Sequence, residues 1–149
     1  QPNVDPNRIG IVGHSQGGQV ALLTSALNES VKSVVAYYPV TDIELWAKKT
    51  DLPKEAIDGY INGVCAYEAT QKDRSPVFSA EKIRANVLLL HGDDDKRVPI
   101  KHSEIMLTAL QKHNRKAQLH RVKNGHHGAY GQAWEGTERL VLDYLSQNL

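Results

Sequence analysis

Residues 13–17 read G-H-S-Q-G and lie between two contrasting patterns. A short apolar run, residues 9–12, precedes them, and a helical pattern follows directly. A serine at such a strand-to-helix turn has its hydroxyl pushed out of the sheet, and the first N–H groups of the helix can stabilise an oxyanion. Gly13 and Gly17 suit this turn, because a side chain at either position is expected to collide with the strand or the helix. The pattern indicates a nucleophilic Ser15; the alternative is a glycine-rich turn with an ordinary N-cap serine.

Length and composition are those of one globular domain. The chain has 149 residues, of which 40% are hydrophobic and 23% charged, enough for a sizeable core. Its net charge is +1 and it has no long basic run, so neither a nucleic acid nor a membrane surface is expected as a partner. No apolar stretch approaches the ~20 residues of a membrane span. Cys65 is the single cysteine, which excludes an intrachain disulfide and leaves the cellular compartment unknown.

Four short apolar runs predict four strands, at residues 8–12, 33–38, 86–91 and 118–122. Each is followed by a helix or a helical segment. Strands that are apolar along nearly their whole length and alternate with helices are typical of a parallel sheet covered on both faces. The expected fold class is therefore α/β, with a parallel sheet of about four strands.

Three helices are predicted around this sheet. The first covers residues 16–27, with Val20, Leu23 and Leu27 as its buried stripe. The other two cover residues 101–113 and about 132–145. Their inner sides are predicted to carry Ser103, Met106, Leu107 and Leu110, and Trp134, Val141 and Leu145, respectively.

Residues 41–80 form a long excursion between the second and third strands. A helix is expected to begin near Pro53, a residue suited to a first helical position, with Ile57, Ile61 and Val64 as its apolar stripe. We interpret the excursion as a cap-like insertion within the single domain. Its aromatic residues either line a pocket for the acyl or leaving group or anchor the insertion to the core; they are Trp46, Tyr60, Tyr67 and Phe78.

A serine hydroxyl becomes a good nucleophile only when a base takes its proton and a third group orients that base. Residues 91–99, H-G-D-D-D-K-R-V-P, follow the third strand, and a carboxylate there can orient a histidine, because the carboxyl ends of parallel strands share one edge. The three aspartates could also form only a solvated turn. A metal site is not expected, because adjacent aspartates diverge and no matching ligand set is present.

The candidate base lies in residues 125–128, G-H-H-G, after the fourth strand. Only one of His126 and His127 can face Ser15. Ser15, the aspartates and this histidine pair follow the first, third and fourth strands, so they are expected at the same sheet edge. Other histidines, His102, His113 and His120, are expected to be inert surface residues.

Residues 8–18, 75–99 and 125–128 resemble the α/β-hydrolase superfamily, most closely its prolyl oligopeptidase-like branch and related esterases. The resemblance implies a Ser-Asp-His triad and no cofactor. The family pattern H-G-x-x-D-x-x-V-P places the acid at Asp95. Alignment on Gly125 makes His126 the base, which we prefer, whereas alignment on Gly128 makes it His127. The backbone N–H of Gln16 would serve the oxyanion.

Gln16 departs from the peptidases of this branch, which usually carry tyrosine or another bulky residue after the serine, and is closer to esterases. We therefore expect a serine hydrolase that cleaves carboxylic esters through an acyl-enzyme on Ser15, with short peptides or amides second. The alternatives are a prolyl oligopeptidase-type serine peptidase and a catalytically incomplete fragment with a binding or assembly role.

The front of the chain is a second departure, since several strands precede the serine turn in the family. The chain resembles the C-terminal half of a hydrolase domain, a partial α/β-hydrolase fold that looks N-terminally truncated. The strand at residues 8–12 would then lack a partner on one side, and unpaired apolar strands invite pairing with another chain. We expect self-association through this edge.

Overall fold

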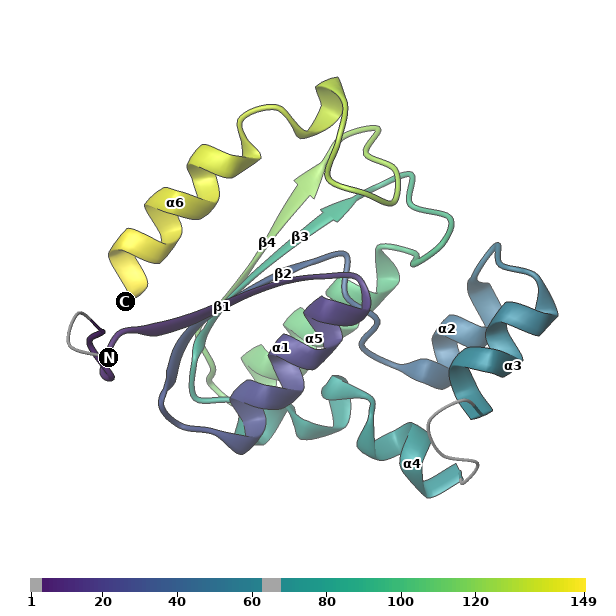
Figure 1. Ribbon diagram of the computed structural model, residues 1–149, viewed down its shortest axis with the longest axis horizontal. Coiled ribbons are helices and arrows are strands. Elements are labelled where there is room, and N and C mark those ends of the chain that lie inside the picture. Colours follow the sequence, from purple (N-terminus) through teal and green to yellow (C-terminus); the bar gives the residue numbers. More distant parts are fainter. Residues whose placement is uncertain (1–3, 63–67) are drawn as a thin grey trace.

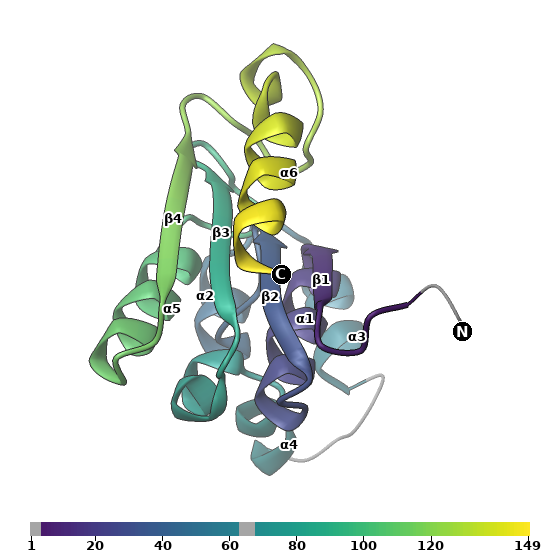
Figure 2. The ribbon, with the colours of Figure 1, turned by 90° about the vertical axis from the view of Figure 1, so that its left-hand side faces the viewer.

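The computed structural model describes residues 4–62 and 68–149. Its centre is a parallel four-stranded sheet in the order β1-β2-β3-β4, and Figure 2 shows the strands side by side. The strands are β1 (Ile9–His14), β2 (Val31–Tyr37), β3 (Asn86–Gly92) and β4 (Ala117–Val122). All four strands predicted from the apolar runs are present, and their pairing confirms the parallel sheet.

Helices cover both faces of the sheet, as predicted. On one face lie α1 (Gln16–Leu27), α5 (Lys101–Lys112) and the short 3-10 helix η1 (Pro76–Lys82). On the opposite face lies α6 (Thr137–Asn148) (Figures 1 and 2). A short 3-10 helix, η2 (Gln132–Trp134), precedes α6.

Side chains of the central strands enter two apolar clusters in alternation. Val34 and Leu89 belong to the cluster under α1 and α5, whereas Val35 and Leu90 belong to the cluster under α6. Successive side chains of a strand point to opposite faces, so a strand covered on both sides must be apolar along its length. This explains the near-continuous apolar runs of β2 and β3.

The buried face of α1 differs from the prediction. Val20 and Leu27 are 54% and 85% exposed, and small residues such as Gly18 and Ala21 face the core instead. A Cβ atom on Gly18 would lie only 3.1 Å from Cβ of Pro39 and 3.3 Å from the carbonyl oxygen of Tyr37. The helix therefore packs close to the sheet through Gly18, Ala21 and the fully buried Leu22, whereas Val20 and Leu27 face outward.

The last helix also begins later than predicted. Gly136, with φ of 81°, separates η2 from α6 and interrupts the helix expected from residue 132. The predicted inner residues are otherwise confirmed, since Trp134 and Val141 are buried on α6's side of the sheet. On α5 the predicted residues Ser103, Met106 and Leu110 are buried.

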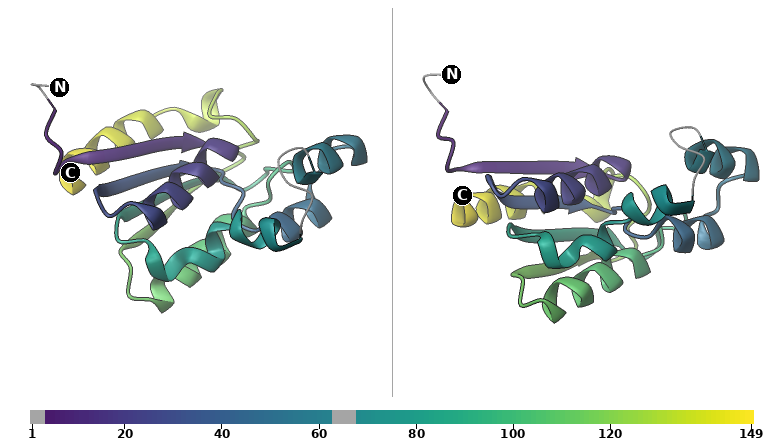
Figure 3. Two further views of the ribbon diagram at one scale, coloured as in Figure 1. Left: turned by 60° about the horizontal axis from the view of Figure 1, so that its bottom comes forward. Right: turned by 90° about the horizontal axis from the view of Figure 1, so that it is seen from below.

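The excursion between β2 and β3 contains α2 (Ile43–Lys49), α3 (Lys54–Asn62) and α4 (Glu68–Asp73). α3 begins directly after Pro53, as expected. In Figures 1 and 3, α2 and α3 lie beyond the carboxyl ends of the strands. Val64, Cys65 and Tyr67 lie outside the described residues.

The aromatic residues of the excursion have different surroundings. The indole N–H of Trp46 donates to the carbonyl oxygen of Arg97 over 3.0 Å, and the Tyr60 ring lies 4.7 Å from the Trp46 ring. Trp46 is almost fully buried, whereas Phe78 is 53% exposed. These contacts favour the anchoring interpretation for Trp46, because it ties α2 to the segment that follows β3.

Candidate active site

Ser15 occupies a sharp turn between β1 and α1. Its φ of 52° and ψ of −117° lie outside the regions that most residues adopt. The turn is held by the Ser15 N–H, which donates to the Tyr37 carbonyl over 2.9 Å, and by the Ser15 carbonyl, which accepts from Gln19 N–H over 3.1 Å. Gln16 is the first residue of α1, where backbone N–H groups have no acceptor within the helix.

Close packing of glycines permits this turn, although not at both expected positions. A Cβ on Gly13 would lie 2.2 Å from the Gly17 carbonyl oxygen, so only glycine fits there. A Cβ on Gly17 would meet nothing within 4 Å. The expected collision at Gly17 is thus wrong, and the second tight position of this turn is Gly18.

The three consecutive aspartates after β3 lie in three different environments. Asp95 is 4% exposed, and its Oδ1 accepts backbone N–H groups of Arg97 over 3.0 Å and Val98 over 2.8 Å. Asp93 Oδ1 instead accepts from the N–H of Asn124, and Asp94 pairs with Lys96 at the surface. Two backbone donors on one oxygen leave the other oxygen of Asp95 free to orient a histidine.

His127 bridges the carboxylate and the serine. Its Nδ1 lies 2.7 Å from Asp95 Oδ2, and its Nε2 lies 3.1 Å from Ser15 Oγ. Because a carboxylate can only accept, Nδ1 carries a proton that it donates to Asp95, so Nε2 is the nitrogen that faces the serine hydroxyl.

His126 does not reach the serine, so the preference for it over His127 is corrected. The His126 side chain is 72% exposed, with Nδ1 3.2 Å from Asp94 Oδ2. Adjacent side chains in an extended or turning segment point in different directions, so only one histidine of the pair can enter the site. The structure brings together Ser15, Asp95 and His127.

Two glycines bring the segment after β3 that carries the aspartates (the acidic loop, residues 93–99) and the histidine loop (residues 123–131) together. A Cβ on Gly92 would lie 2.1 Å from the Gly125 carbonyl oxygen, so the two backbones touch. The N–H of Asp94 donates to that same carbonyl over 3.1 Å. This contact between the ends of β3 and β4 fixes the spacing of Asp95 and His127.

A buried histidine, His91, supports the acidic loop through both of its ring nitrogens. His91 Nε2 donates to the Val98 carbonyl over 2.7 Å, and its Nδ1 accepts from the Ser103 hydroxyl over 2.7 Å. Burial lowers the pKa of His91 to about 4, although the Val98 carbonyl and the Asp95 charge oppose this shift. His91 is therefore neutral, and both of its nitrogens hold the loop that presents Asp95.

His102, expected at the surface, is fully buried in α5. Its Nδ1 accepts from the backbone N–H of Thr41 over 3.3 Å, and burial lowers its pKa to about 4. The expectation fails because His102 lies beside the predicted inner residue Ser103, on the face that α5 turns toward the sheet. Its Nε2 is buried without a partner among the described residues.

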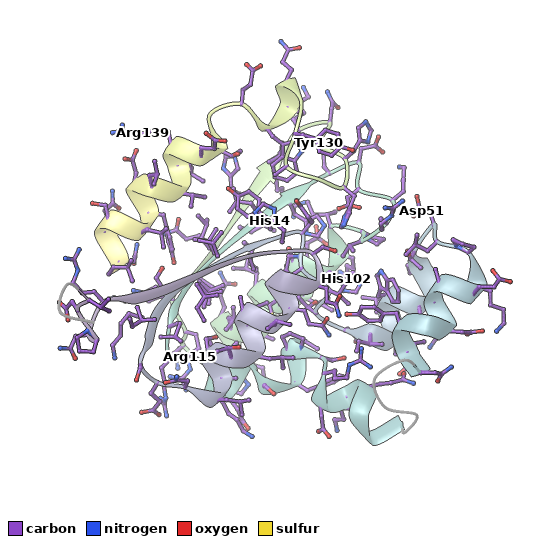
Figure 4. All side chains as sticks on the ribbon, in the orientation of Figure 1. His14, Asp51, His102, Arg115, Tyr130 and Arg139 are labelled. Carbon is purple, nitrogen blue, oxygen red and sulfur yellow. The ribbon has the colours of Figure 1, made fainter. Side chains whose placement is uncertain are left out.

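Beside His127 lies a cavity of about 220 Å³. Two of the residues that line it are labelled in Figure 4, Asp51 between α2 and α3 and Tyr130 on the histidine loop. Lys96 and Arg97 also line the cavity, each close to an aspartate that lines it, Asp94 and Asp51 respectively. The excursion and the histidine loop thus both border the site.

Among residues 4–62 and 68–149, no three His, Cys, Asp or Glu side chains are placed to bind one metal ion. Within the same described ranges, each helix is too short or too polar to cross a membrane.

The chain is similar over its whole length to known peptidases. Residues 1–149 match the model of the prolyl oligopeptidase family. An uncharacterized peptidase, YuxL, of Bacillus subtilis is 29% identical over 97% of the chain, which corresponds to 22% of the relative. The chain thus spans about a fifth of that relative's length.

Solved structures give the same fold. A Mycobacterium tuberculosis puromycin-hydrolyzing peptidase superposes with a TM-score of 0.87 at 28% identity, over 98% of this chain and 22% of that one. The acylaminoacyl peptidase of Pyrococcus horikoshii superposes with a TM-score of 0.89 at 23% identity, over 100% of this chain and 25% of that one. The family model matches every residue of the chain, and the parallel sheet and the serine turn are consistent with it. The chain belongs to the prolyl oligopeptidase family.

Proposed function

We propose that the chain carries the catalytic triad of a serine peptidase, with Ser15 as nucleophile, His127 as base and Asp95 as the residue that orients the base. The observation that carries the proposal is the continuous path from Ser15 Oγ to His127 Nε2 at 3.1 Å and from His127 Nδ1 to Asp95 Oδ2 at 2.7 Å. Nucleophile, base and orienting carboxylate in hydrogen-bond reach are the arrangement required for acyl transfer.

The reaction then follows from the positions of these atoms. His127 Nε2 takes the Ser15 proton as Oγ attacks the substrate carbonyl carbon, and Asp95 stabilises the resulting imidazolium. The N–H of Gln16 donates to the developing oxyanion. Collapse of the tetrahedral intermediate breaks the bond to the leaving group, which receives the proton from Nε2, and water releases the acyl group by the reverse sequence.

A peptide or amide is the favoured substrate class, which reverses the order expected from Gln16. The family match and the relatives named as peptidases support this choice over carboxylic esters. One structural relative is described as hydrolysing puromycin. Short peptides and their amides are therefore the first substrates to test, with simple esters second. No cofactor enters the proposed reaction.

The test is a pair of variants in the intact protein. Ser15→Ala is expected to abolish cleavage of peptide p-nitroanilides and labelling by a fluorophosphonate probe. His127→Ala should lower kcat by at least about 10³-fold, whereas His126→Ala, its matched control, should stay within a few-fold of the wild type.

Three results would count against the proposal. They are a Ser15→Ala loss below about 10²-fold, a failure of the parent protein to react with the probe, and a larger loss in His126→Ala than in His127→Ala. Ester turnover without amide turnover would retain the triad and restore the esterase alternative. A chain that binds substrates without any turnover would support the binding or assembly alternative.

A further inference from the structure

Tyr38 joins the two segments that carry the serine and the histidine. It follows the last residue of β2, and its backbone N–H donates to the Leu90 carbonyl of β3 over 2.7 Å. Its φ of 36° is a left-handed conformation that is rare for an aromatic residue. Strained backbone of this kind persists when the surroundings fix it, and it often marks a functional position.

The Tyr38 hydroxyl contacts both the histidine loop and the residue before Ser15. It accepts the backbone N–H of Ala129 on the histidine loop over 3.0 Å. It also lies 2.8 Å from Nδ1 of His14, the residue before Ser15. Burial raises the pKa of Tyr38 and lowers the pKa of His14, so the phenol keeps its proton and can donate it to a neutral imidazole.

The Tyr38 ring packs against the base itself. Its centroid lies 4.6 Å from that of His127, with a tilt of 59° between the planes. On another side, Trp134 contacts the ring edge-to-face with a centroid distance of 5.5 Å. One nearly buried side chain therefore contacts both the His127 ring and the loop backbone two residues beyond it.

The histidine loop needs such a contact because its own sequence gives it little rigidity. It contains Gly125, Gly128 and Gly131, and the last two have φ values of 112° and 81°. Glycines widen the range of conformations that a loop can adopt. A small displacement of a reacting group can lower the rate by about 10²-fold.

We propose that Tyr38 is a positioning residue that holds the histidine loop against the serine turn, so that His127 faces Ser15. This inference rests on the proposed function. Tyr38 does not enter the reaction in this proposal; it acts through His127 by packing against its ring and by binding the N–H of Ala129.

The test is Tyr38→Phe in the intact protein, which removes the hydroxyl and keeps the ring. Loss of the two hydroxyl contacts should lower kcat and the rate of fluorophosphonate labelling by about 10- to 100-fold, with KM within about 2-fold. Tyr144→Phe is the matched control, because it removes a hydroxyl from a buried tyrosine of the same apolar cluster, and its kcat should equal that of the wild type. Ala129→Pro removes the donor instead of the acceptor and should lower kcat like Tyr38→Phe.

The outcomes separate this inference from the proposed function. Inactive Ser15→Ala together with wild-type kcat in both Tyr38→Phe and Ala129→Pro would overturn only the positioning role. Equal losses of thermal stability and kcat in Tyr38→Phe and Tyr144→Phe would also overturn it, because a general effect of hydroxyl removal would then explain both. Full activity in Ser15→Ala would overturn the proposed function.

Discussion

His91 and His102 are neutral, fully buried imidazoles close enough to Asp95 for its charge to act on both. Burial lowers the pKa of each from 6.5 to about 4. In the unfolded chain these residues take up protons near pH 6.5, whereas in the folded chain they do so only near pH 4. The unfolded state therefore binds more protons between these values, and folding stability falls as the pH decreases through this window.

This linkage can be measured at His102. We expect the wild type to lose stability in urea unfolding between pH 6.5 and 4.5, and His102→Asn to lose about 2 kcal/mol less over the same interval. Asparagine keeps an acceptor for the Thr41 N–H but does not take up a proton. His113→Asn, at an exposed histidine, is the control and should follow the wild type. Parallel pH curves for His102→Asn and the wild type would contradict the prediction.

Which residue of a candidate group enters the site was predictable where a family pattern selected one position. It was not predictable where a contact between loops decides. The family pattern that residues 91–99 resemble selected Asp95 among three aspartates, and the structure buries that carboxylate. His126 and His127 each adjoin a glycine, so the sequence pattern fits both. Which of the two histidines faces Ser15 depends on the backbone contact between Gly125 and Gly92. That contact joins segments that are far apart in the sequence. The contacts of Tyr38 with the histidine loop could not be predicted, because no sequence motif includes this residue.

At the scale of elements, the ends of β3 and β4 depend on contact between two backbones. Gly92→Ala would place a Cβ 2.1 Å from the Gly125 carbonyl oxygen, and backbone atoms cannot move aside as a flexible side chain can. We expect a loss of stability of at least about 3 kcal/mol, at the upper end for overpacking, together with lower kcat, because the loops bearing Asp95 and His127 separate.

The matched control is Gly59→Ala in α3, where a Cβ would meet nothing within 4 Å. Alanine is favoured over glycine inside a helix by about 0.5–1 kcal/mol, so this variant should be slightly more stable in chemical denaturation. If Gly92→Ala unfolds at the same denaturant concentration as the wild type, the two loops are not held by this contact.

Elements were predictable where burial on both faces leaves a continuous apolar run, as at residues 86–91. The buried face of α1 was not, because periodicity assigned the core to Val20, Leu23 and Leu27. The structure instead packs Gly18, Ala21 and Leu22 against the sheet. Close approach of a helix to a strand selects small residues, and a hydrophobicity pattern gives these little weight.

At the scale of the whole molecule, β1 is an edge of the sheet and pairs with β2 alone among the described strands. Apolar side chains are exposed around this edge: Val12 is 47% exposed, and Val20 and Leu27 are exposed on the adjacent α1. An open strand edge flanked by apolar surface can pair with another copy of itself. Two copies related by a two-fold axis beside β1 would pair their edge strands and cover the exposed side chains of Val12, Val20 and Leu27 in both copies.

We therefore propose that residues 1–149, studied as an isolated chain, self-associate through β1. Sedimentation at protein concentrations on the order of 10–100 μM should show a mass that rises with concentration. Val12→Lys places a charge on the exposed side of the edge strand and should restore a monomer, because desolvating a lysine there opposes pairing. Val4→Lys, at a 54% exposed residue before β1, is the matched control and should still associate. A constant monomer mass for the wild type, or equal dissociation of the two lysine variants, would show that the β1 edge does not drive association.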